Sequence, residues 1–76
     1  MINDPSKEKL LEIKVISDNL YDAIINSNRT LRPTKGRIKI KDRKVYLVFP
    51  DKYYNVNIKR SRSMYTMTIY NNPINK

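Results

Sequence analysis

The hydrophobic residues follow a helical period in the N-terminal third of the chain. Between Pro5 and Ile25 they recur every three to four positions with polar residues between them, as in an amphipathic helix. Asp4 before Pro5 is a typical helix start, because aspartate can accept hydrogen bonds from the first N–H groups and proline has the φ of a first helical residue. We therefore predict a helix over about residues 5–25. Leu11 and Val15 fall on its polar side, whereas its apolar arc contains Leu10, Ile13, Ile16, Leu20, Tyr21, Ala23 and Ile24.

After Gly36 the period changes from 3.6 to two. Apolar and polar residues alternate in four segments rich in β-branched and aromatic side chains, which are 37–41, 44–49, 53–59 and 64–70. Short connections suited to turns separate them, and each keeps the alternation in phase. The pattern predicts a sheet of four antiparallel strands over about residues 36–70.

The registers of these strands can be compared, because a slip by one residue would turn an apolar set outward. One set of pairings aligns Ile38, Leu47, Tyr54 and Ile69 in a row, and another aligns Ile40, Val45, Val56 and Met67. Both rows lie on the same face. We therefore expect an α+β fold in which one N-terminal helix packs on a four-stranded antiparallel β-meander. The prediction treats residues 1–76 as a single domain with a frayed tail at 71–76.

The same registers place cationic and phenolic side chains together on the opposite face. The rows there read Arg37, Val48, Tyr53 and Tyr70; Lys39, Tyr46, Asn55 and Thr68; and Lys41, Lys44, Asn57 and Thr66. Charge is concentrated in the same part of the chain. Residues 1–28 carry three basic and five acidic residues, a net of −2, whereas residues 29–76 carry thirteen and two, a net of +11. This asymmetry predicts a surface that faces a polyanion.

Basic and tyrosine side chains on an open sheet are suited to nucleic acid. Lysine and arginine neutralise phosphates, and tyrosine rings offer flat surfaces on which bases stack. We expect DNA or RNA as partner, with single strands slightly favoured. The candidate binding residues are Arg37, Lys39, Lys41, Lys44, Tyr46, Tyr53, Lys59, Arg60, Arg62 and Tyr70.

Ordinary structural roles would also account for these residues. Tyrosine pairs stabilise exposed sheet faces in proteins that bind nothing, and surface lysines discourage aggregation between sheet edges. The dense run from Lys59 to Ser63 is either a clamp for a phosphate backbone or a hydrated hairpin tip.

Other functional classes are limited by composition. The chain has no Cys, no His and one Gly, so we expect no disulfide, no metal, no cofactor, no phosphate-binding glycine loop and no catalytic triad built on His or Cys. A small toxin-like ribonuclease that uses Lys, Arg and Tyr is the remaining enzymatic alternative. A further alternative is an interaction protein that inhibits a host enzyme or defence complex by protein–protein contact.

The origin and location of the protein follow from composition as expectations. Asn, Ile, Lys and Tyr supply 35 of the 76 residues, which suggests an A/T-rich genome such as that of a phage, virus or plasmid. No segment has the ~18 consecutive apolar residues of a membrane span, and no signal-peptide pattern is visible. We expect a cytoplasmic protein with no membrane contact. The last strand predicts a possible homodimer, because Met64 or Ile69 would extend the sheet at its edge.

Overall fold

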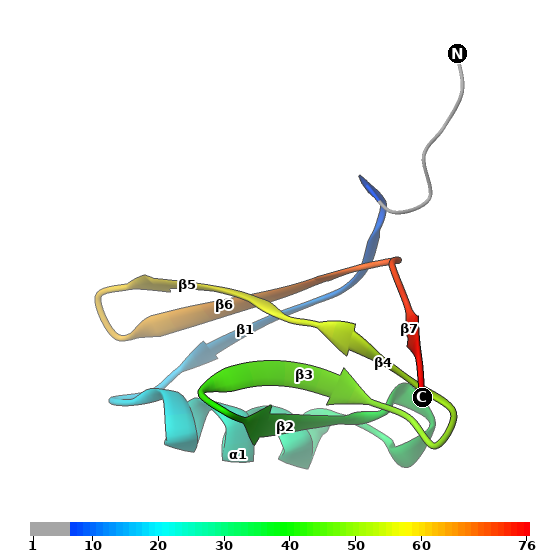
Figure 1. Ribbon diagram of the computed structural model, residues 1–76. Coiled ribbons are helices and arrows are strands. Elements are labelled where there is room, and N and C mark those ends of the chain that lie inside the picture. The colour runs from blue at the N-terminus through cyan, green and yellow to red at the C-terminus, as the bar shows by residue number, and fades with distance from the viewer. Residues whose placement is uncertain (1–6) are drawn as a thin grey trace.

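The computed structural model describes residues 7–76 and confirms an α+β fold (Figure 1). This part of the chain contains one α-helix and seven strands, and the strands form two antiparallel sheets. The elements in chain order are β1 (Lys9–Ile16), α1 (Leu20–Thr30), a 3₁₀ turn η2 (Pro33–Lys35), β2 (Arg37–Lys41), β3 (Lys44–Val48), β4 (Lys52–Asn55), β5 (Asn57–Ser61), β6 (Met64–Tyr70) and β7 (Ile74–Asn75).

The prediction of an N-terminal helix was wrong, because a strand precedes the helix. In β1 the burial alternates: Leu11, Ile13 and Val15 are partly buried, whereas Glu12 and Lys14 are exposed. Ile16, which the helical prediction placed on the buried side, is 73% exposed. A run of apolar residues this dense fits either period, and its β-branched members favour the strand. The predicted start at Asp4 and Pro5 lies outside the described residues.

The helix begins after Asn19, a residue that the predicted helix over residues 5–25 placed in its interior. The Asn19 side chain accepts a hydrogen bond of 2.8 Å from the backbone N–H of Asp22, which is the usual role of an N-cap residue. At the other end, the N–H of Leu31 donates to the carbonyl of Ser27. The helix therefore continues to Thr30, beyond its predicted end at about residue 25.

Pairing between the first three predicted strands agrees with the expected register. Ile38 pairs with Leu47, Ile40 with Val45, and Leu47 with Tyr54. Asp42 and Arg43 connect β2 to β3 and have φ values of 51° and 66°. Left-handed values at both positions are what a tight two-residue hairpin turn requires.

The predicted third strand, 53–59, is divided at Val56. Its first part, β4, belongs to the sheet β2-β3-β4-β7, and its second part, β5, belongs to the sheet β1-β6-β5. The N–H of Val56 donates to the carbonyl of Val45, which attaches the bend to β3. As a result Ile58, and not Val56, pairs with Met67. The shift of two residues leaves the same side chains facing inward.

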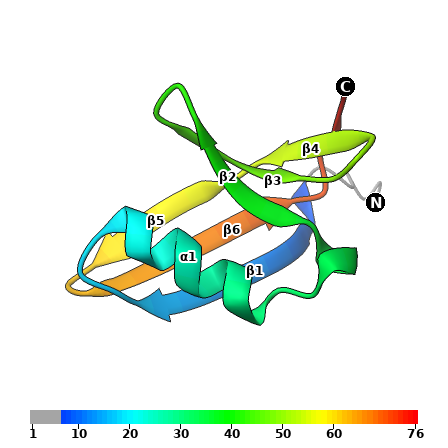
Figure 2. The same ribbon diagram turned by 90° about the horizontal axis from the view of Figure 1, so that it is seen from below.

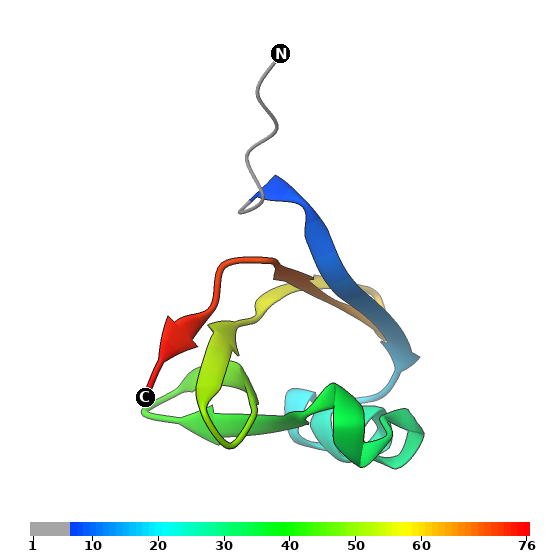
Figure 3. The same ribbon diagram turned by 90° about the vertical axis from the view of Figure 1, so that its right-hand side faces the viewer.

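The core lies between two layers. Figure 3 shows α1 beside the β2–β3 hairpin in one layer and β1, β6 and β5 in the other, and Figure 2 shows α1 extending along the β1 side of β2. Gly36 leads into β2 with a φ of 83°, and an added Cβ would lie 3.0 Å from the Phe49 ring. The buried hydrophobic residues are Ala23, Ile24, Ile38, Val45, Leu47, Tyr54, Tyr65, Met67 and Ile69.

Two expectations about the end of the chain were also wrong. Residues 71–76 are not simply frayed, because Ile74 pairs with Tyr53 and Asn75 with Lys52 in β7. The fourth predicted strand, β6, is not an edge, because it lies between β1 and β5. A homodimer cannot therefore form by adding a strand at β6.

Candidate nucleic-acid interface

Strand pairing gathers basic and aromatic residues on the outer face of the sheet β2-β3-β4-β7. Arg37 lies opposite Val48, Lys39 opposite Tyr46, and Lys41 opposite Lys44. Val48 in turn lies opposite Tyr53. Residues that face one another across paired strands project from the same side. The alternate residues Ile38, Leu47 and Tyr54 fill the core, so the basic and phenolic side chains are directed outward.

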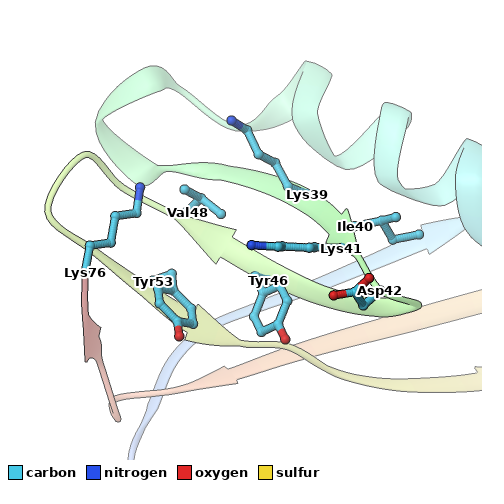
Figure 4. Close-up of a pocket in the computed structure, with 8 residues that line it drawn as sticks. All are labelled: Lys39, Ile40, Lys41, Asp42, Tyr46, Val48, Tyr53 and Lys76. Atoms are coloured by element: carbon cyan, nitrogen blue, oxygen red, sulfur yellow. The ribbon is translucent and has the colours of Figure 1, made fainter.

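These side chains surround an open groove of about 660 Å³ (Figure 4). Tyr46, Val48 and Tyr53 form its aromatic and aliphatic part, and lysines stand around them. The full lining consists of Lys39, Ile40, Lys41, Asp42, Tyr46, Val48, Tyr53 and Lys76. We call this surface the lysine–tyrosine groove.

The two tyrosines contact each other edge to face. The centroids of the Tyr46 and Tyr53 rings are 5.4 Å apart and their planes meet at 89°. Such pairs are favourable because the positive edge of one ring meets the negative face of the other. One flat base cannot lie parallel to both rings at once. The groove therefore presents two aromatic rings that meet at a right angle.

The cations of this face have no carboxylate partner within residues 7–76. Both ion pairs found there involve Glu12 on β1, which lies in the other sheet. Lys41 and Lys44 lie directly opposite each other, an arrangement that is destabilising unless a negative charge intervenes. Asp42, in the adjoining turn, is the one acidic residue among those that line the groove. The positive charge is therefore free to contact an external anion.

Lys59 and Tyr70 belong to a different surface. Both lie on the outer face of β1-β6-β5, with Asn57, Thr66 and Thr68. The predicted alignment of Tyr53 with Tyr70 is wrong, because the bend at Val56 sends β5 to the other sheet and Tyr70 pairs with Lys9. Between the two surfaces lies a smaller depression lined by Asn55, Asn57, Tyr70 and Asn72.

This second face is partly neutralised by Glu12. Its carboxylate lies 2.8 Å from the Lys9 ammonium and 3.9 Å from that of Lys14. The hydrogen bond and the charge of Lys9 lower the pKa of Glu12, and the same hydrogen bond and the Glu12 charge raise the pKa of Lys9. At neutral pH the pair stays ionised, which leaves less uncompensated charge here than around the lysine–tyrosine groove.

Arg60 makes contacts within the protein. Its guanidinium lies 5.3 Å from the centroid of the buried Tyr65 ring, and Nη2 is 3.5 Å from the carbonyl oxygen of Asp18. Its Nε donates to the carbonyl of Arg62, which has a φ of 58° at the hairpin tip. Lys59 and Arg60 project to opposite sides of the sheet, so the basic run from Lys59 to Ser63 does not form one clamp.

The ten predicted residues thus lie in three places. Lys59 and Tyr70 are on the outer face of the three-stranded sheet, and Arg60 and Arg62 belong to the β5–β6 hairpin. Six lie together on the outer face of the four-stranded sheet, and these are Arg37, Lys39, Lys41, Lys44, Tyr46 and Tyr53. Lys76, which lines the groove, was not among the candidates. Its place depends on β7, and two paired residues are too short a segment to show a period in the sequence.

Other features of the described chain are few. Among residues 7–76 no three His, Cys, Asp or Glu side chains cluster as metal ligands would. No helix in that range has the length and hydrophobicity needed to cross a membrane. Comparisons with protein-family models, with curated proteins and with solved structures find no match.

Proposed function

We propose that this protein binds nucleic acid through the lysine–tyrosine groove and the adjoining basic strand β2. The observation that supports the proposal best is the set of cations on this face that have no carboxylate partner among residues 7–76, including the directly opposed Lys41 and Lys44. A phosphate backbone would supply the negative charge that this surface lacks, and its binding would release counterions.

Single strands suit the groove better than duplexes. The Tyr46–Tyr53 pair is only partly buried, and it can stack a base only if that base is unpaired and turned toward the protein. Asn55 lies opposite Tyr46 and is exposed, so its amide can hydrogen-bond to a base edge or sugar beside the stacked base. The proposed role is binding, and it requires no catalytic group.

Charge reversal tests the proposal. The triple variant Arg37→Glu, Lys39→Glu, Lys41→Glu alters only exposed positions on β2, so the fold should be retained. Its affinity for a single-stranded oligonucleotide, measured by fluorescence anisotropy in low salt, should fall by at least about 100-fold, because three phosphate contacts become repulsive.

A matched control separates the groove from net charge alone. The variant Arg29→Glu, Arg32→Glu, Lys35→Glu changes the formal charge by the same amount, from +9 to +3, at exposed positions outside the groove. It should lose much less affinity. Equal losses in the two variants would show that binding depends on overall charge, and unchanged affinity in the β2 variant would refute the proposed surface.

A further inference from the structure

The strand β2 is an edge of its sheet, and its outer edge is only partly covered. It stands first in the order β2-β3-β4-β7. The Asn28 side chain of α1 covers one position, because its Oδ1 accepts from the N–H of Ile38 at 2.8 Å and its Nδ2 donates to the carbonyl of Ile38 at 3.0 Å. The amide of Asn28 thus occupies the position that a neighbouring strand would take.

Two residues further along β2, the backbone N–H and C=O of Ile40 have no such hydrogen-bond partner among residues 7–76. Lys41 and Lys44 flank a two-residue turn, and such flanking residues exchange both of their backbone hydrogen bonds. Hydrogen-bonded and non-hydrogen-bonded pairs alternate along an antiparallel ladder, so Ile40 and Val45 form a non-hydrogen-bonded pair. The carbonyl of Val45 accordingly bonds to Val56 on the far side of β3. The N–H and C=O of Ile40 must therefore point away from β3, at the free edge.

Exposed apolar side chains lie beside these backbone groups. Ile40 is 47% exposed, Tyr21 is 69% exposed and Ile25 is 40% exposed. Together with Ile24, Asn28, Ile38 and Lys39 they line one depression between α1 and β2. On the opposite side of the same strand stand the exposed lysines Lys39 and Lys41.

This arrangement defines the chemistry of a strand that would be added to β2. Its inward side chains would contact Ile40, Tyr21 and Ile25 and would have to be apolar. Its outward side chains would lie beside Lys39 and Lys41 and would be favoured as carboxylates. A second copy of β2 does not meet these requirements, because antiparallel pairing centred on Ile40 would place Lys39 opposite the partner's Lys41.

We propose that the β2 edge binds an extended segment of a partner protein in which apolar and acidic residues alternate, by addition of that segment as a strand. The partner hydrogen-bonds to the free N–H and C=O of Ile40, and its apolar side chains cover the depression against α1. This inference concerns a different ligand from the proposed nucleic acid and does not depend on it.

A synthetic peptide of about eight residues that alternates Val and Glu, blocked at both ends, tests the proposal on the full chain. The peptide is expected to add antiparallel to β2, where the valine opposite Ile40 exchanges both backbone hydrogen bonds with it, so that this valine directs its own N–H toward β2. N-methylation of the valines should weaken binding at least about tenfold, whereas N-methylation of the glutamates should change it less than about threefold. The measurement is a titration followed by amide NMR spectra of the protein.

A protein variant provides an independent test. Ile40→Pro removes the free N–H without removing a hydrogen bond to β3, and prolines are tolerated at such edge positions. It should lose peptide binding at least about tenfold while circular dichroism shows that the fold is retained, whereas Ile40→Val should keep peptide binding. No binding of the unmodified peptide, or equal binding of the two methylated peptides, would overturn the proposal. Binding of a Val–Lys peptide as tight as that of the Val–Glu peptide would also overturn it.

Discussion

Tyr46 and Tyr53 are the residues whose geometry says most about a ligand. Their perpendicular contact fixes the orientation of both rings, so each ring affects what the other presents to a base. Removing either tyrosine removes one ring and the contact that holds the other ring in place. The two residues should therefore act as one unit in binding.

Alanine substitutions test this coupling. We expect Tyr46→Ala and Tyr53→Ala each to weaken binding of a single-stranded oligonucleotide by about 1–3 kcal/mol. The double variant should lose clearly less than the sum of the two, because the second substitution removes a ring that is already displaced. The measurement is a double-mutant cycle by anisotropy, with each variant's stability checked by thermal unfolding.

The comparison for this cycle is a duplex of the same length. Its bases are already stacked on one another, so its binding should depend much less on the two rings. Additive losses on the single strand, or equal losses on both probes, would show that the tyrosines do not stack a base.

At the scale of the element, β1 is the segment in which two periods compete. Val15 and Ile16 are neighbours of similar chemistry, but the strand directs Val15 inward and leaves Ile16 73% exposed. A helix over residues 5–25 would place them the other way round. Their substitutions therefore distinguish the two structures.

We expect Val15→Ser to lower the free energy of unfolding by about 1–3 kcal/mol, because it replaces a partly buried apolar side chain that packs on the core with a polar one. Ile16→Ser should change it by less than about 0.5 kcal/mol, as is usual at an exposed site. Urea unfolding followed by circular dichroism measures both. The reverse order of effects would contradict the strand.

The elements differ in how well the sequence predicts them, because some segments fit only one hydrophobic period and others fit two. From Arg37 to Asn55 only a period of two fits, and a two-residue turn preserves it, so the register and the outer face were predictable. Between Leu10 and Ile16 the apolar residues satisfy both periods, and the N-cap role of Asn19 becomes clear only once the strand is recognised. Packing against β6 decides between them.

The same reasoning applies to the candidate site. Six of its residues lie together because their strands pair as the alternation requires. Lys59 and Tyr70 were assigned to that face because alternation continues through Val56 without a sign of the bend. A change of sheet that keeps the inward–outward alternation leaves no trace in the sequence pattern.

At the scale of the whole molecule, the distribution of charge sets a limit on binding. The outer face of the four-stranded sheet offers five cations, Arg37, Lys39, Lys41, Lys44 and Lys76, whereas Glu12 offsets part of the charge on the other sheet. If binding is confined to the first face, at most about five phosphates are neutralised.

This limit predicts the salt dependence. For a single strand, log K should fall with log salt concentration with a slope no steeper than about −3.5, since each phosphate contributes about −0.7. Titrations at several salt concentrations measure the slope. Substituting Lys59 with Ala should leave it unchanged, whereas Lys41→Ala should make it shallower by about 0.7. A slope much steeper than this limit would require cations from the second face.

The bend at Val56 has a consequence for any attempt to divide the protein. One residue separates the strand that β4 gives to one sheet from the strand that β5 gives to the other, and the hydrogen bond from Val56 to Val45 joins that residue to β3. Neither half can be excised as a fragment with its own intact interior, since cutting here exposes both layers. The grooved sheet and its neighbour therefore depend on each other for a closed interior.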